Sequence, residues 1–171
     1  MAELKEEGLV RHIGVSNFDV EQLVRLRQIA PVETLQPPYS LVDRAAANEI
    51  LPYAEQVGIG VIVYSRMGSG LLTGKMTRER IEALPEDDSR KHDARVQEPL
   101  LSHHLALVQR LQTVADRHQT TPGAVAVAWT PVNPAMDGAI VGFRRPDQVD
   151  PLMSAATLEL TDDDVAVIRG A

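Results

Sequence analysis

Four apolar runs of the sequence each end in polar or glycine-containing residues that can take part in binding chemistry. Their hydroxyl and amide groups can pair with an amide, and an aromatic side chain can stack on a flat ring. A glycine followed by arginines can meet a phosphate at a helix N-terminus. A nicotinamide nucleotide has all of these parts. The residues in these places are Ser16, Asn17, Gln36, Tyr39, Tyr64, Ser65, Gly142, Phe143 and Arg144.

The apolar runs predict strands, and a helical pattern follows each of them. The expected strands cover residues 9–15, 32–36, 60–64 and 139–141, and the second ends at Pro37 and Pro38 because neither can donate to a ladder. The third contains Val-Ile-Val after two glycines, so we expect it to be buried on both faces. Alternating strands and helices predict a parallel sheet with right-handed crossovers, in which functional groups gather at the carboxyl ends of the strands.

Capping residues predict where several helices begin. A side-chain oxygen before the first turn can accept a backbone N–H, and proline is tolerated in that turn. Apolar residues at helical spacing support a helix after the first cap, with a stripe of Leu23, Val24, Leu26 and Ile29, and another helix across residues 101–114. The predicted caps are Asp19 with Gln22, Thr121 with Pro122, and Thr161 with Asp164.

The number of strand–helix units predicts half of an eight-unit barrel. A closed barrel of eight parallel strands needs about 250 residues, and this chain has 171. We predict a single half-barrel domain over residues 1–171, in the α/β class. Within it, residues 66–100 form a long mobile loop, because they show little periodicity.

A half-barrel leaves inward-facing side chains and two edge strands open to water. We therefore predict a homo-oligomer or docking on a complementary half-barrel. A rearranged chain and a fragment are the alternatives. A clean monomer in light scattering would count against the oligomer.

Composition limits the possible partners and compartment. Lys plus Arg number 17 and Asp plus Glu number 24, so the net charge is -7, which argues against nucleic acid or an anionic membrane as a main partner. The absence of cysteine excludes disulfides and thiolate catalysis. No signal peptide or bilayer-spanning apolar run is present, and we expect a cytoplasmic protein without a metal site.

Five motifs, in this order along nearly the whole chain, closely resemble those of the aldo-keto reductases. In that family, TIM-barrel reductases bind NADPH, usually in preference to NADH, along the carboxyl ends of the strands. The resemblance therefore implies NADPH as the cofactor. The motifs are Gly14-Val-Ser-Asn-Phe18, Leu35-Gln-Pro-Pro-Tyr-Ser-Leu41, Gly58-Ile-Gly-Val-Ile-Val-Tyr-Ser65, Ser69-Gly-Leu-Leu-Thr-Gly-Lys75 and Ile140-Val-Gly-Phe-Arg144.

The resemblance also implies which residues bind each part of the cofactor. The nicotinamide carboxamide would be held by Ser16, Asn17 and Gln36, and the ring would stack on Tyr64. The pyrophosphate loop would be lined by Ser65, Met67, Ser69, Gly70 and Leu71, with Lys75 close by. The adenosine 2'-phosphate end would meet Gly142, Phe143, Arg144 and Gln148.

The family's catalytic Asp, Tyr, Lys and His belong to the first half of its barrel, which this chain does not match. The three tyrosines of the chain fall outside the family's catalytic tyrosine motif. Hydride transfer to a carbonyl needs a general acid near the developing alkoxide. We therefore expect little or no carbonyl reductase activity from this chain by itself. The alternatives are a non-catalytic nucleotide-binding or interaction subunit and a half-barrel with a different activity, for example hydrolysis.

The sequence also departs from the family's pattern at two places. Arg66 stands where the family usually has a proline after Tyr-Ser, and Pro151 with Leu152 stands where it often has an acidic residue and asparagine. These differences bear on the loop after the third strand and on the adenine contacts.

Overall fold

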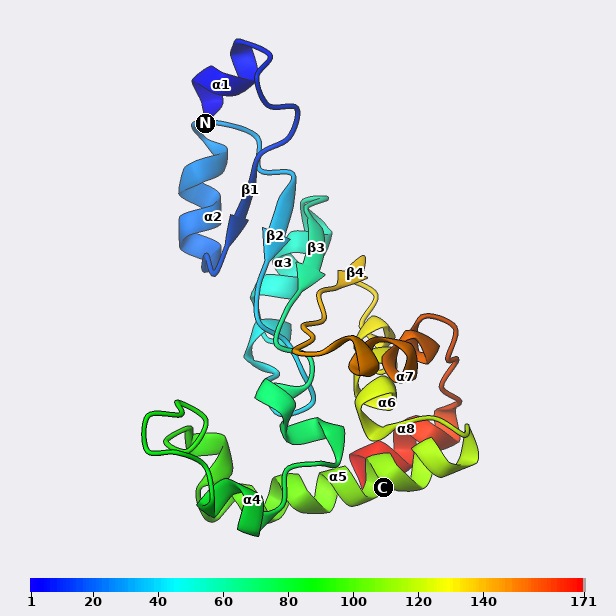
Figure 1. Cartoon of the computed structure of the whole chain (residues 1–171). Coiled ribbons are helices and arrows are strands. Elements are labelled where there is room, and N and C mark those ends of the chain that lie inside the picture. Colours follow the sequence, from blue (N-terminus) through cyan, green and yellow to red (C-terminus); the bar gives the residue numbers. More distant parts are fainter. Residues whose placement is uncertain (171) are drawn as a thin grey trace. The chain divides into compact units, whose positions relative to one another are not determined.

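A computed structural model of the chain describes residues 1–170, which divide into two compact units (Figure 1). The first contains residues 1–39, 43–65 and 131–141 and is called the sheet unit. The second contains residues 40–42, 66–130 and the chain from Gly142 onward and is called the helical unit.

The sheet unit holds all four strands, in the order β1-β2-β3-β4 and all parallel. They are β1 (Gly14–Ser16), β2 (Thr34–Gln36), β3 (Gly60–Val63) and β4 (Gly138–Ala139). In the register of the sheet, Val15 pairs with Leu35, and Leu35 pairs with Val61. Each strand is followed along the chain by a helix. Four such units are half of a TIM barrel, as predicted.

Each strand is shorter than predicted, and before β1 the reason is that other bonds take the backbone. Before β1, the N–H groups of Leu9 and Val10 donate to the carbonyl of Leu4, so these apolar residues form a turn. β2 ends at Gln36 as predicted, because Pro37 and Pro38 have no N–H to donate. The length of an apolar run therefore overestimates the length of the strand that pairs in the sheet.

The helices of the sheet unit are α1 (Ala2–Glu6), α2 (Val20–Arg27) and α3 (Ile50–Gln56), with the 3-10 turn η1 (Ala45–Ala47). The predicted capping box of α2 is confirmed. Asp19 accepts the backbone N–H of Gln22, and the side chain of Gln22 accepts the N–H of Asp19. The predicted apolar stripe of this helix is wrong in part, since Leu23 is buried whereas Val24 and Ile29 are exposed.

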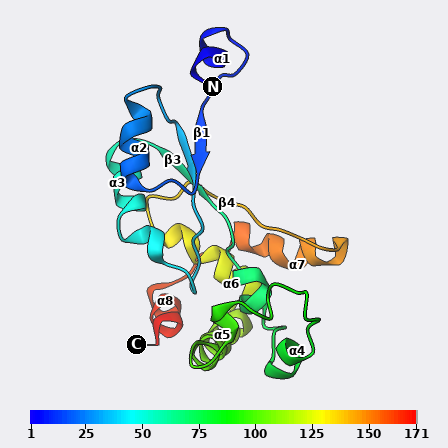
Figure 2. The same ribbon diagram turned by 90° about the vertical axis from the view of Figure 1, so that its left-hand side faces the viewer.

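Only one face of the sheet carries helices within this unit, and α2 and α3 lie on that side (Figures 1 and 2). Leu35, Val61 and Val63 are at most 1% exposed. Ile62 points to the opposite face, because successive strand residues alternate, and it is 40% exposed. The expectation that this strand is buried on both faces is therefore wrong.

The helical unit is built on α5 (Leu100–Arg117), which packs against α6 (Pro122–Ala128) and α8 (Asp162–Arg169). Leu111, Val114 and Val125 are fully buried in this unit. The predicted caps Thr121 and Thr161 accept the N–H of the residue three positions on. The unit also contains α7 (Val149–Met153) between the 3-10 turns η5 (Pro146–Gln148) and η6 (Ser154–Ala156), while η4 (Thr130–Val132) begins in this unit and ends in the sheet unit.

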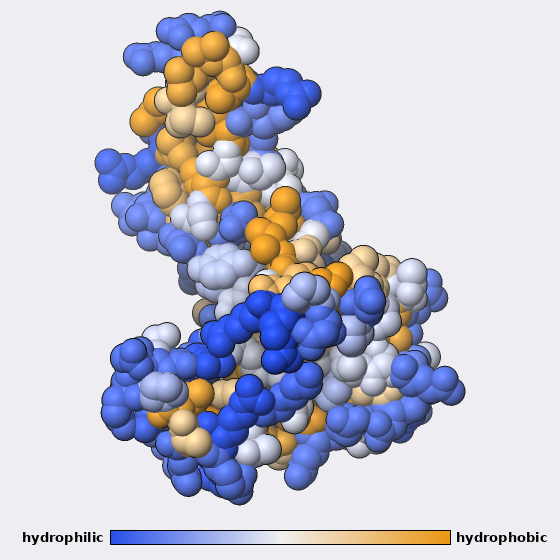
Figure 3. All heavy atoms as spheres, in the orientation of Figure 1, coloured by the Kyte–Doolittle hydropathy of each residue, from blue (hydrophilic) through white to orange (hydrophobic). Residues whose placement is uncertain are grey.

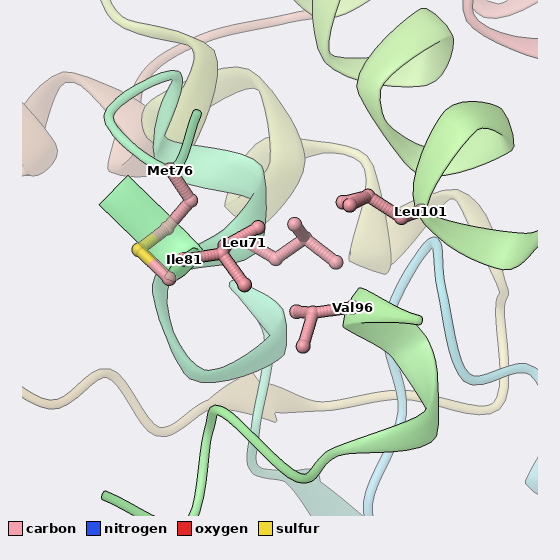
Figure 4. Close-up of a cluster of buried hydrophobic side chains, with 5 residues drawn as sticks. All are labelled: Leu71, Met76, Ile81, Val96 and Leu101. Atoms are coloured by element: carbon pink, nitrogen blue, oxygen red, sulfur yellow. The ribbon is translucent and has the colours of Figure 1, made fainter. Parts of the chain in front are cut away.

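Residues 66–100 contain regular structure despite their weak periodicity. They form η2 (Gly68–Thr73), α4 (Arg78–Glu82) and η3 (Ala94–Val96). Five buried side chains from these turns, the chain between them and the start of α5 form one apolar cluster (Figure 4). Its members are Leu71, Met76, Ile81, Val96 and Leu101. The mobility of this segment stays a prediction. No helix within residues 1–170 is long and apolar enough to cross a membrane.

Candidate functional site

The sheet unit brings together four of the predicted site residues, at the carboxyl ends of β1, β2 and β3. The Ser16 hydroxyl donates to the main-chain oxygen of Gln36 at 2.8 Å. The Tyr64 hydroxyl donates to Oδ1 of Asn17 at 2.9 Å. Ser16, Asn17 and Gln36 are exposed. Each hydrogen bond joins two strand ends, so the four residues form one group, which we call the strand-end group.

Backbone conformation and main-chain hydrogen bonds position the residues of the strand-end group. Asn17 has a φ of 60°, in the left-handed region that asparagine tolerates better than most residues. Beyond β3, the N–H of Tyr64 donates to the carbonyl of Pro37 at 3.2 Å. The N–H of Tyr39 donates to the carbonyl of Tyr64 at the same distance, so Tyr64 is held beside the end of β2. The Tyr39 side chain is only 4% exposed and belongs to the core, although its position had made it a candidate.

Gly14 allows β1 and β2 to approach each other closely. A Cβ at this position would lie 2.0 Å from Oγ1 of Thr34 and 3.1 Å from its carbonyl oxygen. On the exposed face of the sheet, beside the strand-end group, lies an open hollow of about 330 Å³. That volume is near the lower end for small-molecule sites, about 300–1,000 Å³. The hollow is lined by Gly14, Val15, Ser16, Thr34, Leu35, Gln36 and Ile62.

The chemistry of the strand-end group fits a nicotinamide. A nicotinamide has a flat ring and a carboxamide that both donates and accepts hydrogen bonds. Ser16 offers a hydroxyl, Asn17 an amide and Tyr64 an aromatic ring. Among residues 1–170, no group of three or more His, Cys, Asp or Glu side chains is arranged to hold a metal ion.

The other predicted cofactor residues, apart from Ser65, lie in the helical unit. In the loop after β3, the main-chain oxygen of Met67 accepts the N–H groups of Gly70 and Leu72 at 3.0 and 3.1 Å. Ser69 and Gly70 have φ values of 57° and 97°, which form a tight turn.

The Leu71 side chain is buried in the apolar cluster, so only its main chain remains to face a ligand. Ser65, in the sheet unit, also has a positive φ, 61°. Lys75 is exposed.

The segment after β4 forms a second polar region of the helical unit. Oε1 of Gln148 accepts the N–H groups of Arg144 and Arg145, at 2.8 and 3.3 Å, and so caps η5. The Arg145 guanidinium makes two 3.1 Å bonds to the Asp147 carboxylate. Arg144 is exposed, as are Gly142 and Phe143.

An acidic residue lies within electrostatic reach of Arg144. Hydrogen bonds from Arg90 hold the pKa of Asp88 well below its usual range, and the positive charge of Arg144 adds a smaller effect in the same direction. Arg144 is therefore a cation with a carboxylate in its neighbourhood. An anion bound by Arg144 would therefore also be repelled by the carboxylate of Asp88.

Two polar clusters escaped prediction because their members are far apart in the sequence. In the helical unit, Asp164 is 2% exposed and accepts hydrogen bonds from His118 at 2.8 Å and Arg117 at 3.1 Å. Burial would raise the pKa of Asp164, but bonds from His118, Thr161 and Arg117 outweigh burial and lower it to about 2. This cluster joins the end of α5 to the start of α8.

In the sheet unit, Glu33 ties the N-terminal segment to β2. Its carboxylate accepts Lys5 Nζ and the N–H of Ile13, each at 2.9 Å. The hydrogen bond from Lys5, and then that from Ile13, lower the pKa of Glu33 to about 2. No local sequence pattern predicts a role for Glu33. Its role could be predicted only if residues 13 and 33 were known to lie beside each other.

Comparison with known proteins identifies the family. The family model described as "Aldo/keto reductase family" matches residues 1–171. The chain is 38% identical over 165 residues to aldo-keto reductase YhdN of Bacillus subtilis (strain 168), covering 96% of this chain and 49% of that protein. It is 31% identical over 167 residues to the NADH-specific methylglyoxal reductase of Escherichia coli (strain K12), covering 98% and 50%.

A solved structure agrees with these relatives. The glycerol dehydrogenase AKR11B4 from Gluconobacter oxydans superimposes with a TM-score of 0.90 at 34% identity, over 99% of this chain and 51% of that one. The chain thus spans about half the length of the relatives that it matches. Because the family model covers its whole length, the chain belongs to the aldo/keto reductase family.

Proposed function

We propose that this chain supplies the NADP(H)-binding half of an aldo-keto reductase, whose family reaction is the NADPH-dependent reduction of aldehydes or ketones. One observation carries the proposal. The hydrogen bonds of Ser16 with Gln36 and of Tyr64 with Asn17 gather exposed polar groups at the carboxyl ends of three parallel strands. Active sites of TIM barrels form at this end of the strands.

Each proposed contact uses a chemical property of the side chain. Ser16, Asn17 and Gln36 hold the carboxamide, and Tyr64 stacks on the ring. The cofactor, when bound, supplies a hydride to a carbonyl carbon. The remaining residues serve the phosphates: Ser65, Met67, Ser69, Gly70, Leu71 and Lys75 at the pyrophosphate, and Gly142, Phe143, Arg144 and Gln148 at the 2'-phosphate end.

The family's general acid is not among the motifs that this chain matches. A carbonyl accepting hydride needs a proton donor within hydrogen-bond reach. We therefore propose that the chain alone binds cofactor without turnover. Turnover by the purified chain would contradict this part of the proposal.

The preference for NADPH rests on Arg144, an exposed cation after β4. A guanidinium can bind a 2'-phosphate through charge-assisted hydrogen bonds. The E. coli relative is named NADH-specific, so both cofactors belong in the test.

The test is a titration of the full chain with NADPH and with NADH, following cofactor fluorescence. Tyr64→Ala should weaken binding by about tenfold, because the ring and its hydrogen bond are both lost. Tyr53→Ala is the matched control, since the Tyr53 hydroxyl accepts from Arg27 on α2, away from the strand ends. Absence of saturable binding at millimolar cofactor would contradict the proposed function.

We also propose that a second half-barrel, in the simplest case a second copy of this chain, covers the exposed face of the sheet. The support is Ile62, which is 40% exposed in β3, and the hollow beside it. Hydrophobic residues form much of the visible surface of the sheet unit, in the upper part of Figure 3. Sedimentation velocity at micromolar concentration should detect a dimer that Ile62→Glu dissociates. A wild-type monomer would contradict self-association.

A further inference from the structure

We infer that the Tyr64 hydroxyl is a positioning group, which orients the side-chain amide of Asn17 so that its Nδ2 protons face the ligand. The strand-end group then recognises a primary amide through donors from Asn17 and an acceptor from Ser16. The inference rests on the proposed function and adds a second role for Tyr64, separate from its aromatic ring.

The first step concerns Asn17. Its side chain has one acceptor oxygen and an NH₂ group with two protons. The Tyr64 hydroxyl donates to that oxygen at 2.9 Å. Reversing the amide would turn its NH₂ towards the hydroxyl, which can also accept. A phenol oxygen is a weaker acceptor than its proton is a donor, however, because its lone pairs are partly delocalised into the ring. The bond from Tyr64 therefore favours the orientation in which Asn17 offers donors.

The second step concerns Ser16. A serine hydroxyl has a single proton, and this one is directed to the main-chain oxygen of Gln36 at 2.8 Å. Only the lone pairs of the hydroxyl remain for a ligand. Ser16 therefore acts as an acceptor towards anything bound at the strand ends.

Together the two side chains complement a carboxamide. The carbonyl oxygen of a carboxamide accepts from Asn17, and its NH₂ group donates to Ser16. A carboxylate could satisfy Asn17 but would place a second acceptor against Ser16, which is unfavourable.

The backbone holds the pair firmly enough for this role. Main-chain bonds hold Tyr64 beside the end of β2, and the bond from its hydroxyl holds the side chain of Asn17. The ring and the hydroxyl of Tyr64 can be separated by experiment, because Tyr64→Phe keeps the ring.

Calorimetric titration of the full chain with three cofactors separates the two hydrogen bonds. NADPH has both the carbonyl oxygen and the NH₂ group. The 3-acetylpyridine analogue keeps the oxygen but has no NH₂, and the thionicotinamide analogue keeps the NH₂ but has sulfur, a weak acceptor, in place of oxygen. Tyr64→Phe should weaken NADPH and the acetylpyridine analogue about fivefold and the thionicotinamide analogue less than twofold. Ser16→Ala should instead spare the acetylpyridine analogue.

The outcomes distinguish failure of the inference from failure of the proposed function. Equal losses of all three cofactors in Tyr64→Phe, or no loss, would overturn the inference and leave the proposed function standing. Failure of the wild type to bind NADPH would overturn both. If Tyr64→Phe does not fold by circular dichroism, Asn17→Ala carries the test and should show the same dependence on the carbonyl oxygen.

A second readout needs no cofactor. The side-chain NH₂ resonances of Asn17 in the free chain should shift and broaden in Tyr64→Phe, because the amide loses its fixed orientation. The same resonances should be unchanged in Tyr53→Phe. Unchanged Asn17 resonances in Tyr64→Phe would overturn the inference.

Discussion

The two units of the molecule differ in how completely each buries its own apolar surface. Among residues 1–170, eleven large hydrophobic residues are exposed, and eight of them belong to the sheet unit. The helical unit instead encloses its apolar side chains between α5, α6, α8 and the segment before α5. The helical unit therefore has an apolar core of its own. The sheet unit presents surface that suits a further partner.

Truncating one apolar side chain in each unit tests whether the two units differ in how they bury apolar surface. Leu111 in α5 is 0% exposed, and Leu111→Ala should lower the free energy of unfolding by about 3 kcal/mol, because it leaves a cavity. Ile29 is 76% exposed, and Ile29→Ala should cost less than about 0.5 kcal/mol. Urea denaturation measures both. A cost for Ile29→Ala close to that for Leu111→Ala would mean that the surface around Ile29 is covered in solution.

A second test concerns the close approach of β1 and β2. Gly14→Ala should destabilise the sheet unit by about 2 kcal/mol, because the added Cβ meets Thr34. Thr34→Ala in the same chain should restore part of the loss, since it removes the nearest atom. Gly142→Ala, where no other heavy atom lies within 4 Å of the added Cβ, is the control. Thermal unfolding followed by circular dichroism gives the comparison.

The helical unit offers a test through pH. Asp164 has a folded pKa of about 2, below its ordinary value of 3.8, so its bonds stabilise the fold above pH 3.8. This stabilisation is lost as the pH falls from about 4 to about 2. Asp164→Asn should lower the free energy of unfolding by about 1–2 kcal/mol at pH 7 and by much less at pH 2.5. The figure at pH 7 is kept low because Arg117 is exposed and solvent screens its charge. Asp163→Asn, in the same helical turn but exposed, is the matched control. An effect of Asp164→Asn that does not change with pH would contradict the role of its charge.

The smallest expected effect concerns cofactor choice, which we assign to the helical unit. Arg144→Ala should weaken NADPH about tenfold and leave NADH nearly unchanged, because only NADPH has a 2'-phosphate. Arg145→Ala is the control, since that guanidinium already binds Asp147. Equal losses for the two cofactors would mean that Arg144 acts through the protein structure.

Local signals explain what could be predicted. The caps at Asp19 and Thr161 depend on residues three positions apart and were confirmed. The parallel sheet followed from the alternation of strands and helices, and the strand-end positions followed from the sheet. Ile62 could not be assigned to an exposed face, because its run is apolar throughout and the covering of each face depends on distant elements.

Interactions between distant positions explain what could not be predicted. The bond from Tyr64 to Asn17 crosses 47 positions, and that from His118 to Asp164 crosses 46. The apolar cluster of residues 71–101 has no regular spacing, so its chain appeared as a loop. Each of these features depends on the tertiary fold, which no short window of sequence contains.

The link between β3 and β4 has a consequence for the order of folding. The Asp137 carboxylate accepts the N–H of Val61 at 2.7 Å across 76 positions, and the N–H of Asp137 donates to the carbonyl of Val61. The partners of β1 and β2, such as Gly14 and Thr34, are only 20 positions apart along the chain. Since long loops close more slowly than short ones, β1, β2 and β3 should pair first. A nascent chain would then keep the edge of β3 unpaired until residues 66–130 have been synthesised.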